Sequence, residues 1–181
     1  MNKTWKTISS KSTYKNRWFS VRHDKVIRPD GQPGTYDVIV KPDFVVVIPI
    51  IDGRFCLVRQ YRHPVKSDSW EFPAGSLDPG ETPLKAAQRE LGEETGLTAR
   101  RFTKLGYLWT ACGIASFGFT AFVADGCTIH SSHREGSEAD MKAGRFNAEQ
   151  IDSMIRDGVI KDSDTLAAWH LYDLKTRLSK I

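Results

Sequence analysis

A nearly continuous apolar run, DFVVVIPII at residues 43–51, constrains the fold of this chain more than any other feature. Its β-branched residues favour a strand, and the near absence of polar alternation is typical of a buried strand. Asp52-Gly53 then supplies the residues that a tight hairpin needs, and RFCLVRQYR at 54–62 is predicted to be the partner strand. The sequence therefore predicts a buried hairpin within a β-sheet.

Turn signals and capping residues divide the rest of the chain into further strands and three helices. Strands are predicted at 17–28, 35–41, about 104–110 and 117–125. Irregular segments are predicted at 63–81 and 126–144. Helices are predicted over 82–95, from Asn147 to Asp157, and over 162–178. The predicted fold class is mixed α/β.

The composition is that of an ordinary soluble protein with one domain, because 40% of its 181 residues are hydrophobic and 27% are charged. No apolar run is long enough to span a membrane, and residues 1–18 lack the apolar stretch of a secretory signal. Cys56, Cys112 and Cys127 are widely spaced and odd in number, so buried reduced thiols in a reducing, cytoplasmic compartment are expected. The net charge of +4 is scattered rather than massed, which favours a small anionic substrate over nucleic acid.

The predicted helix at 82–95 has an unusual distribution of charge. Thr82 is a good N-cap, Pro83 suits the first helical position, and Gly96 is a stop signal. An acidic arc of this helix borders the apolar arc that packs on the sheet. The acidic arc holds Glu90, Glu93 and Glu94, and the apolar arc holds Leu84, Ala87 and Leu91.

Like charges at this spacing repel, and Arg89, which can pair with Glu93, cannot neutralise three carboxylates. A cation is therefore expected as their partner. Carboxylates without a nearby His or Cys select a hard ion, Mg²⁺ or alternatively Mn²⁺, over zinc. The alternative is a solvated glutamate-rich face, which is disfavoured because the acidic arc borders the buried one and follows a Pro/Gly-rich loop.

The segment GSLDPGETPLKAAQRELGEETGL at 75–97 resembles the Nudix box, Gly-x5-Glu-x7-Arg-Glu-U-x-Glu-Glu-x-Gly-U with U apolar. Every specified position is filled, by Gly75, Glu81, Arg89, Glu90, Leu91, Glu93, Glu94, Gly96 and Leu97. Seven fixed residues at ordinary usage would match by chance on the order of once in 10⁸ to 10⁹ placements. The resemblance implies an α/β/α sandwich with a mixed sheet, and Mg²⁺-dependent hydrolysis of a nucleoside diphosphate linked to another group.

The resemblance also implies roles for the residues of the box. Glu90 and Glu94 are expected to ligate the metal with the backbone carbonyl of Ala74, and Glu93 is expected to be a further ligand or a base. Supporting roles in the site are implied for Gly75, Glu81 and Arg89: Arg89 orients the glutamates, Glu81 is a structural partner, and Gly75, like Gly96, meets a backbone requirement.

The segment LVRQYRHPVKSDSWEFPAGSLDPGE is similar to the ADP-ribose and nucleoside diphosphate sugar pyrophosphatases, with their V-x-Q-x-R and W-E-x-P-A-G motifs. Arg62 is then expected to contact the diphosphate or distal sugar, and Glu71 to lie at the substrate edge. Arg59, on the same predicted strand, is a weaker candidate. Trp70 is a candidate to stack on the base. The alternatives are a surface ion pair for Arg62 and plain packing for Trp70.

The loop HREGSEADM at 133–141 matches the position where this subfamily carries an acidic general base or extra metal ligand. Glu138 is the first candidate and Glu135 the second, and the alternative is an ordinary charged loop. One departure concerns specificity, because WTACGIASFGF at 109–119 lacks the Ser-Pro-Gly common in ADP-ribose hydrolases. Other nucleoside diphosphate sugars, such as GDP-mannose, therefore remain open as substrates.

Similar enzymes are homodimers whose amino-terminal strands pack on the partner. Residues 1–42 are predicted to be such a dimerisation region and 43–181 the Nudix hydrolase domain, although the sequence alone also allows a monomer. Trp18 and Phe19 are predicted either to reach a base across the dimer or, preferably, to join the core. Two further functions stay open: hydrolysis of nucleoside triphosphates or capped RNA, and an inactive Nudix fold that senses a ligand.

Overall fold

The computed structural model describes residues 4–130 and 141–178 of the chain. The chain divides into two compact units. The first contains the residues up to Asp43 together with Trp109–Gly118, and the second contains Phe44–Leu108 and the residues from Phe119 onward. Among the described residues, no helix has both the length and the apolar character that a membrane crossing needs.

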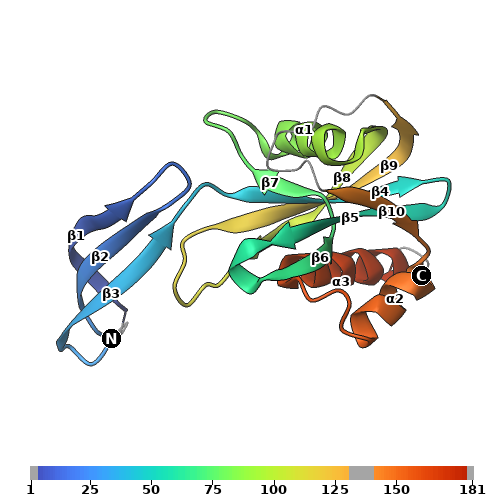
Figure 1. Cartoon of the computed structure of the whole chain (residues 1–181). Coiled ribbons are helices and arrows are strands. Elements are labelled where there is room, and N and C mark those ends of the chain that lie inside the picture. Colours follow the sequence, from blue (N-terminus) through green and yellow to red (C-terminus); the bar gives the residue numbers. More distant parts are fainter. Residues whose placement is uncertain (1–3, 131–140, 179–181) are drawn as a thin grey trace. The chain divides into compact units, whose positions relative to one another are not determined.

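The first unit is a three-stranded antiparallel sheet in the order β1-β2-β3 (Figure 1). Its strands are β1 (Lys6–Lys15), β2 (Ser20–Ile27) and β3 (Pro33–Val40). Strand β1 was not predicted, because its sequence KTISSKSTYK has no apolar alternation and every residue of the strand is exposed. The segment 109–118 attaches to β3, where the Ile39 N–H donates to the Ile114 carbonyl (2.8 Å) and the Ser116 N–H donates to the Ile39 carbonyl (3.0 Å).

The second unit is built on a mixed sheet in the order β10-β5-β4-β9-β8. These strands are β4 (Phe44–Ile51), β5 (Arg54–Arg62), β8 (Leu97–Trp109), β9 (Gly118–Ile129) and β10 (Lys142–Phe146). Two short strands extend it: β6 (Ser67–Glu71) pairs with β5, and β7 (Ala74–Ser76) pairs with β4. Strands β4 and β9 are parallel, whereas β4 is antiparallel to β5 and β7. The predicted hairpin is confirmed, with Ile51 opposite Arg54.

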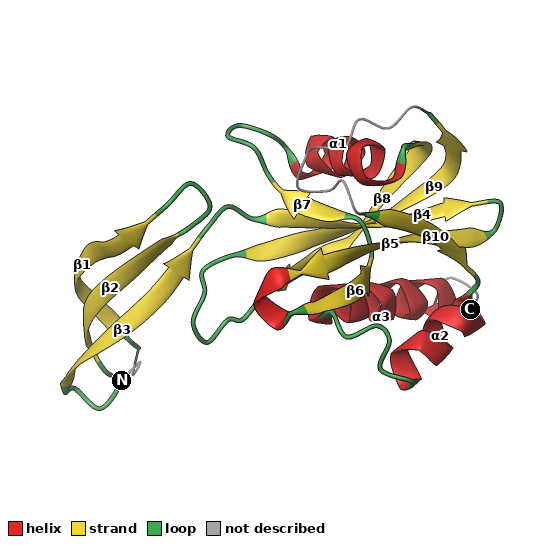
Figure 2. Cartoon of the chain, viewed as in Figure 1, coloured by secondary structure: helices red, strands yellow, loops and turns green. Residues whose placement is uncertain are grey.

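Helices cover both faces of this sheet (Figure 2). Helix α1 (Pro83–Thr95) lies on one face, and α2 (Ala148–Arg156) and α3 (Ser163–Leu178) lie on the other. A short 3₁₀ turn, η1 (His63–Val65), follows β5. The arrangement is the predicted α/β/α sandwich with a mixed sheet and additional amino-terminal strands.

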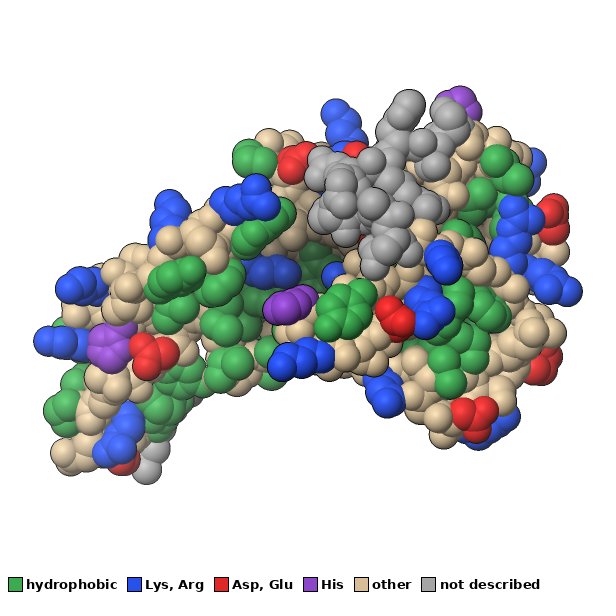
Figure 3. All heavy atoms as spheres, in the orientation of Figure 1, with side chains coloured by type: hydrophobic (Ala, Val, Ile, Leu, Met, Phe, Trp, Pro, Cys, Tyr) green, Lys and Arg blue, Asp and Glu red, His purple; other side chains and the backbone are tan. Residues whose placement is uncertain are grey.

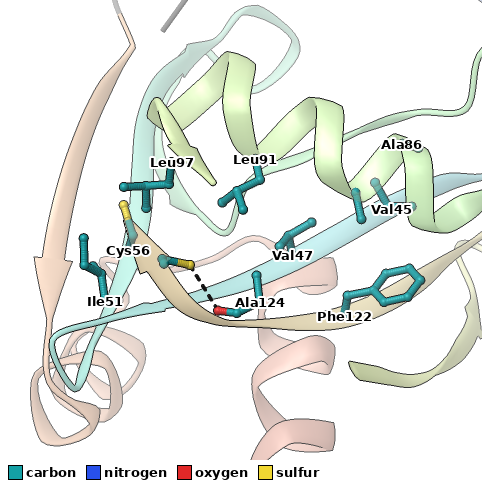
Figure 4. Close-up of a cluster of buried hydrophobic side chains, with 11 residues drawn as sticks. Val45, Val47, Ile51, Cys56, Ala86, Leu91, Leu97, Phe122 and Ala124 are labelled. Atoms are coloured by element: carbon teal, nitrogen blue, oxygen red, sulfur yellow. Dashed lines mark hydrogen bonds between the residues drawn. The ribbon is translucent and has the colours of Figure 1, made fainter. Parts of the chain in front are cut away.

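An apolar core fills the space between α1 and the sheet (Figure 4). Its buried members are Val45, Val47, Ile51, Cys56, Ala86, Ala87, Leu91, Leu97, Phe122, Ala124 and Cys127. The α3 face is aromatic instead, because Phe55 packs edge-on against both Trp169 (4.8 Å between ring centroids) and Tyr172 (5.3 Å). Burial raises the pKa of the Cys56 thiol to about 11, so this thiol stays protonated at neutral pH.

Several sequence predictions differ from the structure. The segment 63–81 contains η1, β6 and β7, and 126–144 contains the end of β9 and most of β10, because these short polar pieces are defined by pairing rather than by apolar content. Strand β8 begins at Leu97, directly after the helix.

The burial of four side chains was also predicted wrongly from the sequence. Leu84 is exposed, whereas Ala86, which the predicted apolar arc does not include, is buried beside Ala87 and Leu91. Trp18 and Phe19 are exposed as well, so the preferred assignment of both to the core is wrong. Cys112 is exposed, unlike the other two thiols.

Candidate active site

Helix α1 buries two carboxylates beside its apolar face. The helix begins where the Thr82 side chain accepts a hydrogen bond from the Lys85 N–H (3.4 Å), and it ends at Gly96 in the left-handed conformation, with φ of 68°. Glu90 is only 6% exposed and Glu94 only 3%. Burying a carboxylate is costly unless protein groups or a cation compensate it, so these two residues define the centre of the site.

Arg89 links the acidic residues of the box. Its Nη1 donates to Glu90 (2.6 Å) and Glu93 (3.0 Å), its Nε and Nη2 donate to Glu81 (3.1 and 2.9 Å), and Nη2 also donates to the Ser76 carbonyl (2.9 Å). The hydrogen bonds to Glu81, followed by the charge of Glu90, raise the pKa of Arg89. The same bond lowers the pKa of Glu81. The predicted Arg89–Glu93 pair is present, and Glu81 and Glu90 share the same guanidinium.

Gly75 lies on β7, opposite Val45 of β4 and directly beneath the Glu90 carboxylate. A Cβ atom at Gly75 would come within 1.9 Å of Glu90 Oε1, which is impossible without displacing that side chain. The sequence predicted a backbone requirement at both box glycines. Gly96 has the positive φ that this implies, whereas the requirement at Gly75 is space for a carboxylate.

The segment before Gly75 is held by the sheet and by α1. The Pro73 carbonyl accepts a hydrogen bond from the Val47 N–H of β4 (2.8 Å). The Ala74 N–H donates to Glu94 Oε2 (3.2 Å), so one buried glutamate already bonds to the residue whose carbonyl is predicted to join it at the metal. The structure therefore brings Ala74, Glu90 and Glu94 together.

Arg62 and Glu71 form a second charged pair in the same unit. Arg62, at the end of β5, donates through Nε to both Glu71 carboxylate oxygens (3.0 and 3.1 Å), and its Nη2 contacts Glu71 as well. Glu71 is only 4% exposed. The bond to Glu71, with smaller contributions from the charges of Glu94 and Asp162, raises the pKa of Arg62. This guanidinium is thus positioned near the box glutamates by a buried partner.

The remaining predicted substrate residues have protein partners on the sheet. Arg59 donates to Asp68 of β6 (2.5 Å), and both side chains are about half exposed. Trp70 packs edge-on against Phe146 of β10, with ring centroids 5.1 Å apart. A Cβ at Gly144 would lie 2.9 Å from the Trp70 ring, so the glycine leaves the space on β10 that this indole occupies. Their roles toward a substrate stay predictions.

Sequence reasoning missed the roles of two residues at the start of α3, namely Asp162, directly before the helix, and Thr165 in its first turn. The Thr165 N–H donates to Asp162 Oδ2 (2.7 Å), and Thr165 Oγ1 accepts a hydrogen bond from the Phe72 N–H (3.1 Å). The predicted helix begins at Asp162, and an acidic residue at a helix start is an N-cap signal, so this role of Asp162 could have been found. The hydrogen bond from Phe72 to Thr165 joins residues 93 positions apart in the sequence, so no local sequence pattern could have predicted it.

The donor chemistry of the site fits a hard divalent ion. Within residues 4–130 and 141–178, no three His, Cys, Asp or Glu side chains converge as a preformed ion cage. Glu90 is engaged by Arg89 and Glu94 by the Ala74 N–H, so their oxygens presently face protein donors. Carboxylate and backbone carbonyl oxygens are nonetheless the ligands that Mg²⁺ and Mn²⁺ prefer. The ligand roles of Ala74, Glu90, Glu93 and Glu94 stay predictions. The candidate bases Glu135 and Glu138 lie outside the described residues.

Residues 41–168 match the model of the NUDIX domain, and residues 5–39 match that of the nucleoside diphosphate sugar hydrolase N-terminal domain. The first match spans more than half of the chain, so this protein belongs to the Nudix family and is a Nudix hydrolase. The predicted resemblance is confirmed.

Characterised relatives cover nearly the whole chain. The chain is 29% identical over 175 residues to the ADP-ribose pyrophosphatase of Bacillus subtilis, covering 96% of this chain and 95% of the relative. It is 33% identical over 166 residues to the ADP-ribose pyrophosphatase of Mycobacterium tuberculosis (90% and 80%) and 30% identical over 176 residues to the methanol dehydrogenase activator of Bacillus methanolicus (96% and 95%). A crystal structure of an ADP compounds hydrolase matches with a TM-score of 0.86 at 23% identity, over 97% of this chain and 95% of that one, which shows a common fold.

Proposed function

We propose that this protein hydrolyses the diphosphate bond of ADP-ribose or another nucleoside diphosphate sugar, such as GDP-mannose, to a nucleoside monophosphate and a sugar phosphate. The observation that carries the proposal is the pair of buried carboxylates, Glu90 and Glu94, packed around Gly75 and Ala74. The two ADP-ribose pyrophosphatases that align over most of the chain support the substrate class.

A bound Mg²⁺ would neutralise phosphate charge and activate water, with Mn²⁺ as a substitute. Glu90, Glu94 and the Ala74 carbonyl would hold the ion, with Glu93 as a further ligand or base. The protein's own contribution is orientation, because Arg89 bonds to both Glu90 and Glu93 and is itself held by the Ser76 carbonyl of β7. Such fixed charges need no rearrangement during the reaction.

Arg62 is the residue that we propose to bind the diphosphate or the distal sugar. Its Nε and Nη2 both bond to Glu71, while Glu94 and Asp162 lie close enough to affect its pKa. A guanidinium matches phosphate geometry well, and Glu71 would aim it at the substrate edge. Arg59 and Trp70 are proposed as peripheral contacts, and Glu138 or Glu135 as the residue that accepts the proton of the attacking water.

We further propose that the protein forms a cytoplasmic homodimer through its first unit. Every residue of β1 is exposed, and apolar side chains gather over the β1–β3 strands (Figure 3). Exposed aromatic residues of this unit include Trp5, Tyr14 and Trp18. Exposed apolar surface of this kind favours a protein partner. Light scattering should report twice the chain mass for the wild type. The double variant Tyr14→Ser, Trp18→Ser should give a lower mass.

The proposed activity is tested with purified protein, Mg²⁺ and a panel of ADP-ribose, GDP-mannose, ADP-glucose, dGTP and capped RNA, with products separated by anion exchange. We expect cleavage of at least one nucleotide sugar, and a rate lower by about 10²-fold or more in Glu94→Gln. Glu149→Gln, an exposed glutamate in the first turn of α2, is the matched control and should act as the wild type. Preferred cleavage of dGTP or capped RNA would replace the substrate class, and inertness toward the panel would favour a ligand sensor.

A further inference from the structure

The four residues 71–74, which run from the last residue of β6 to the first of β7, are held by three different elements. The Phe72 N–H bonds to Thr165 Oγ1 of α3 (3.1 Å), the Pro73 carbonyl to the Val47 N–H of β4 (2.8 Å), and the Ala74 N–H to Glu94 of α1 (3.2 Å). Proline has no N–H, so the backbone donors of the last three residues, 72–74, are the N–H groups of Phe72 and Ala74. Both are bonded to side chains of helices that lie on opposite faces of the sheet (Figure 2).

Thr165 is well placed to fix this segment, because its own position is fixed. The side chain is buried, with 1% of the residue exposed. Its backbone N–H donates to Asp162 Oδ2 (2.7 Å), and the next N–H, of Leu166, donates to the Asp162 carbonyl (3.0 Å). The hydroxyl therefore projects from a capped first turn of a helix rather than from a loop.

The segment that Thr165 holds carries the groups of the candidate site at both ends. Glu71, directly before Phe72, is the buried partner of Arg62. Ala74, two residues after Phe72, donates to Glu94. The Phe72 ring also packs against Trp169 of α3, with centroids 6.1 Å apart. Contact with α3 thus comes from a hydrogen bond and from apolar packing, and the two can be separated by mutation.

We propose that Thr165 is a positioning residue for the metal and substrate groups. By accepting the Phe72 N–H, its hydroxyl sets the path of residues 71–74, and this path aligns Glu94 with the Ala74 carbonyl and aims Glu71 at Arg62. The inference rests on the proposed function, since it assumes that these groups bind the ion and the diphosphate. Removing the acceptor would leave a buried N–H without its partner, and the segment would move to recover one.

Two substitutions separate positioning from packing. Thr165→Val keeps the volume and the branched shape but removes the acceptor, whereas Thr165→Ser keeps the hydroxyl and removes a methyl group. A positioning role predicts that serine behaves as the wild type and valine is impaired. A purely structural role predicts the reverse order, because burial of the methyl group is then what matters. Thr176→Val is the control on the same helix, since the Thr176 hydroxyl bonds only within α3 among the bonds described.

The experiment measures Mn²⁺ binding to the full chain without substrate, from the electron paramagnetic resonance signal of free Mn²⁺, and then kcat and KM for the preferred nucleotide sugar. We expect Thr165→Val to weaken Mn²⁺ affinity by about 10–100-fold and to lower kcat, as partners of metal ligands do, with Thr165→Ser and Thr176→Val near the wild type. Equal affinity in the valine variant and the wild type, or equal losses in valine and serine, would overturn the proposal.

Failure of the proposed function gives a different pattern, because the wild type would then bind no Mn²⁺, or Glu94→Gln would bind as well as the wild type. Should Thr165→Val not fold, Asp162→Ala and Asp162→Asn serve instead. Alanine removes the cap that holds Thr165, whereas asparagine keeps an acceptor there. The proposal requires weaker Mn²⁺ binding in the alanine variant than in the asparagine variant, and equal affinities would contradict it.

Discussion

Strands β4 and β1 show how differently the two units of this chain are stabilised. In β4, FVVVIPII, seven of the eight residues are buried, whereas in β1, KTISSKSTYK, all ten are exposed. The second unit is therefore held by apolar burial on both faces of its sheet. The first is held by strand pairing, turns and contacts such as the Trp5–Tyr36 ring pair, 5.6 Å between centroids. Surface changes should be tolerated in the first unit, whereas the chemistry of the second is tied to its core.

The largest difference between the units is expected on deleting apolar side chains. Leu91→Ala removes a fully buried side chain on the sheet-facing side of α1 and should lower the free energy of unfolding by about 2–5 kcal/mol. Ile8→Ala on β1 removes a side chain that is 56% exposed in the single chain and, at a protein concentration that dissociates the proposed dimer, should change it by less than about 0.5 kcal/mol. Calorimetric melting of both variants provides the measurement. A large loss for Ile8→Ala that depends on protein concentration would show that a second copy covers β1.

Glycine substitutions should separate the units by activity. Gly75→Ala forces the Glu90 carboxylate to move, and misplacing a reacting group by about 1 Å can cost about 10²-fold in rate. The melting temperature should change little, because only the end of a side chain has to shift. Gly113→Ala is the matched change in the first unit, where no atom lies within 4 Å of the added Cβ, and it should keep full activity. Equal hydrolysis rates in the two variants would show that the close contact between Gly75 and the Glu90 carboxylate does not matter for activity.

Backbone strain offers a smaller contrast. Ala111 in the first unit has φ of 48° and Asp52 in the second has φ of 51°, both in the left-handed region. Ala111→Gly should stabilise the protein by about 1 kcal/mol, since alanine is strained there. Asp52→Gly should stabilise the protein by less than Ala111→Gly, because aspartate adopts the left-handed conformation more readily than alanine does. A higher melting temperature for Asp52→Gly than for Ala111→Gly would refute the order.

The smallest effect concerns acid stability of the first unit. Hydrogen bonds from Ser10 and then Arg22 lower the pKa of Asp24 below its ordinary value of 3.8. A lowered pKa in the folded state contributes stability above the ordinary value, and this contribution is lost as pH falls through the folded value. The melting temperatures of the wild type and Asp24→Asn should therefore differ by a constant amount above about pH 5 and converge below 3.8. A gap that widens on acidification would contradict this sign.

The sequence correctly predicted those parts of the structure that are determined by neighbouring residues in the chain. The hairpin at Asp52-Gly53 and the helix between Thr82 and Gly96 follow from turn and cap chemistry, and the box spacing located the buried glutamates. Strands β1, β6 and β10 were missed because polar strands exist only through their partners. The contact between Thr165 and Phe72 was missed for the same reason, since it depends on how α3 docks on the sheet.

The hydrogen bonds of Arg89 limit which substitutions this site can accept during evolution. One planar guanidinium reaches Ser76 at the end of β7, Glu81 in the loop, and Glu90 and Glu93 in the helix, through three nitrogens pointing in different directions. A lysine has a single ammonium on a flexible stem and cannot occupy all of these directions together. Replacement of arginine by lysine, which conserves charge and is common on protein surfaces, is therefore not tolerated at this position.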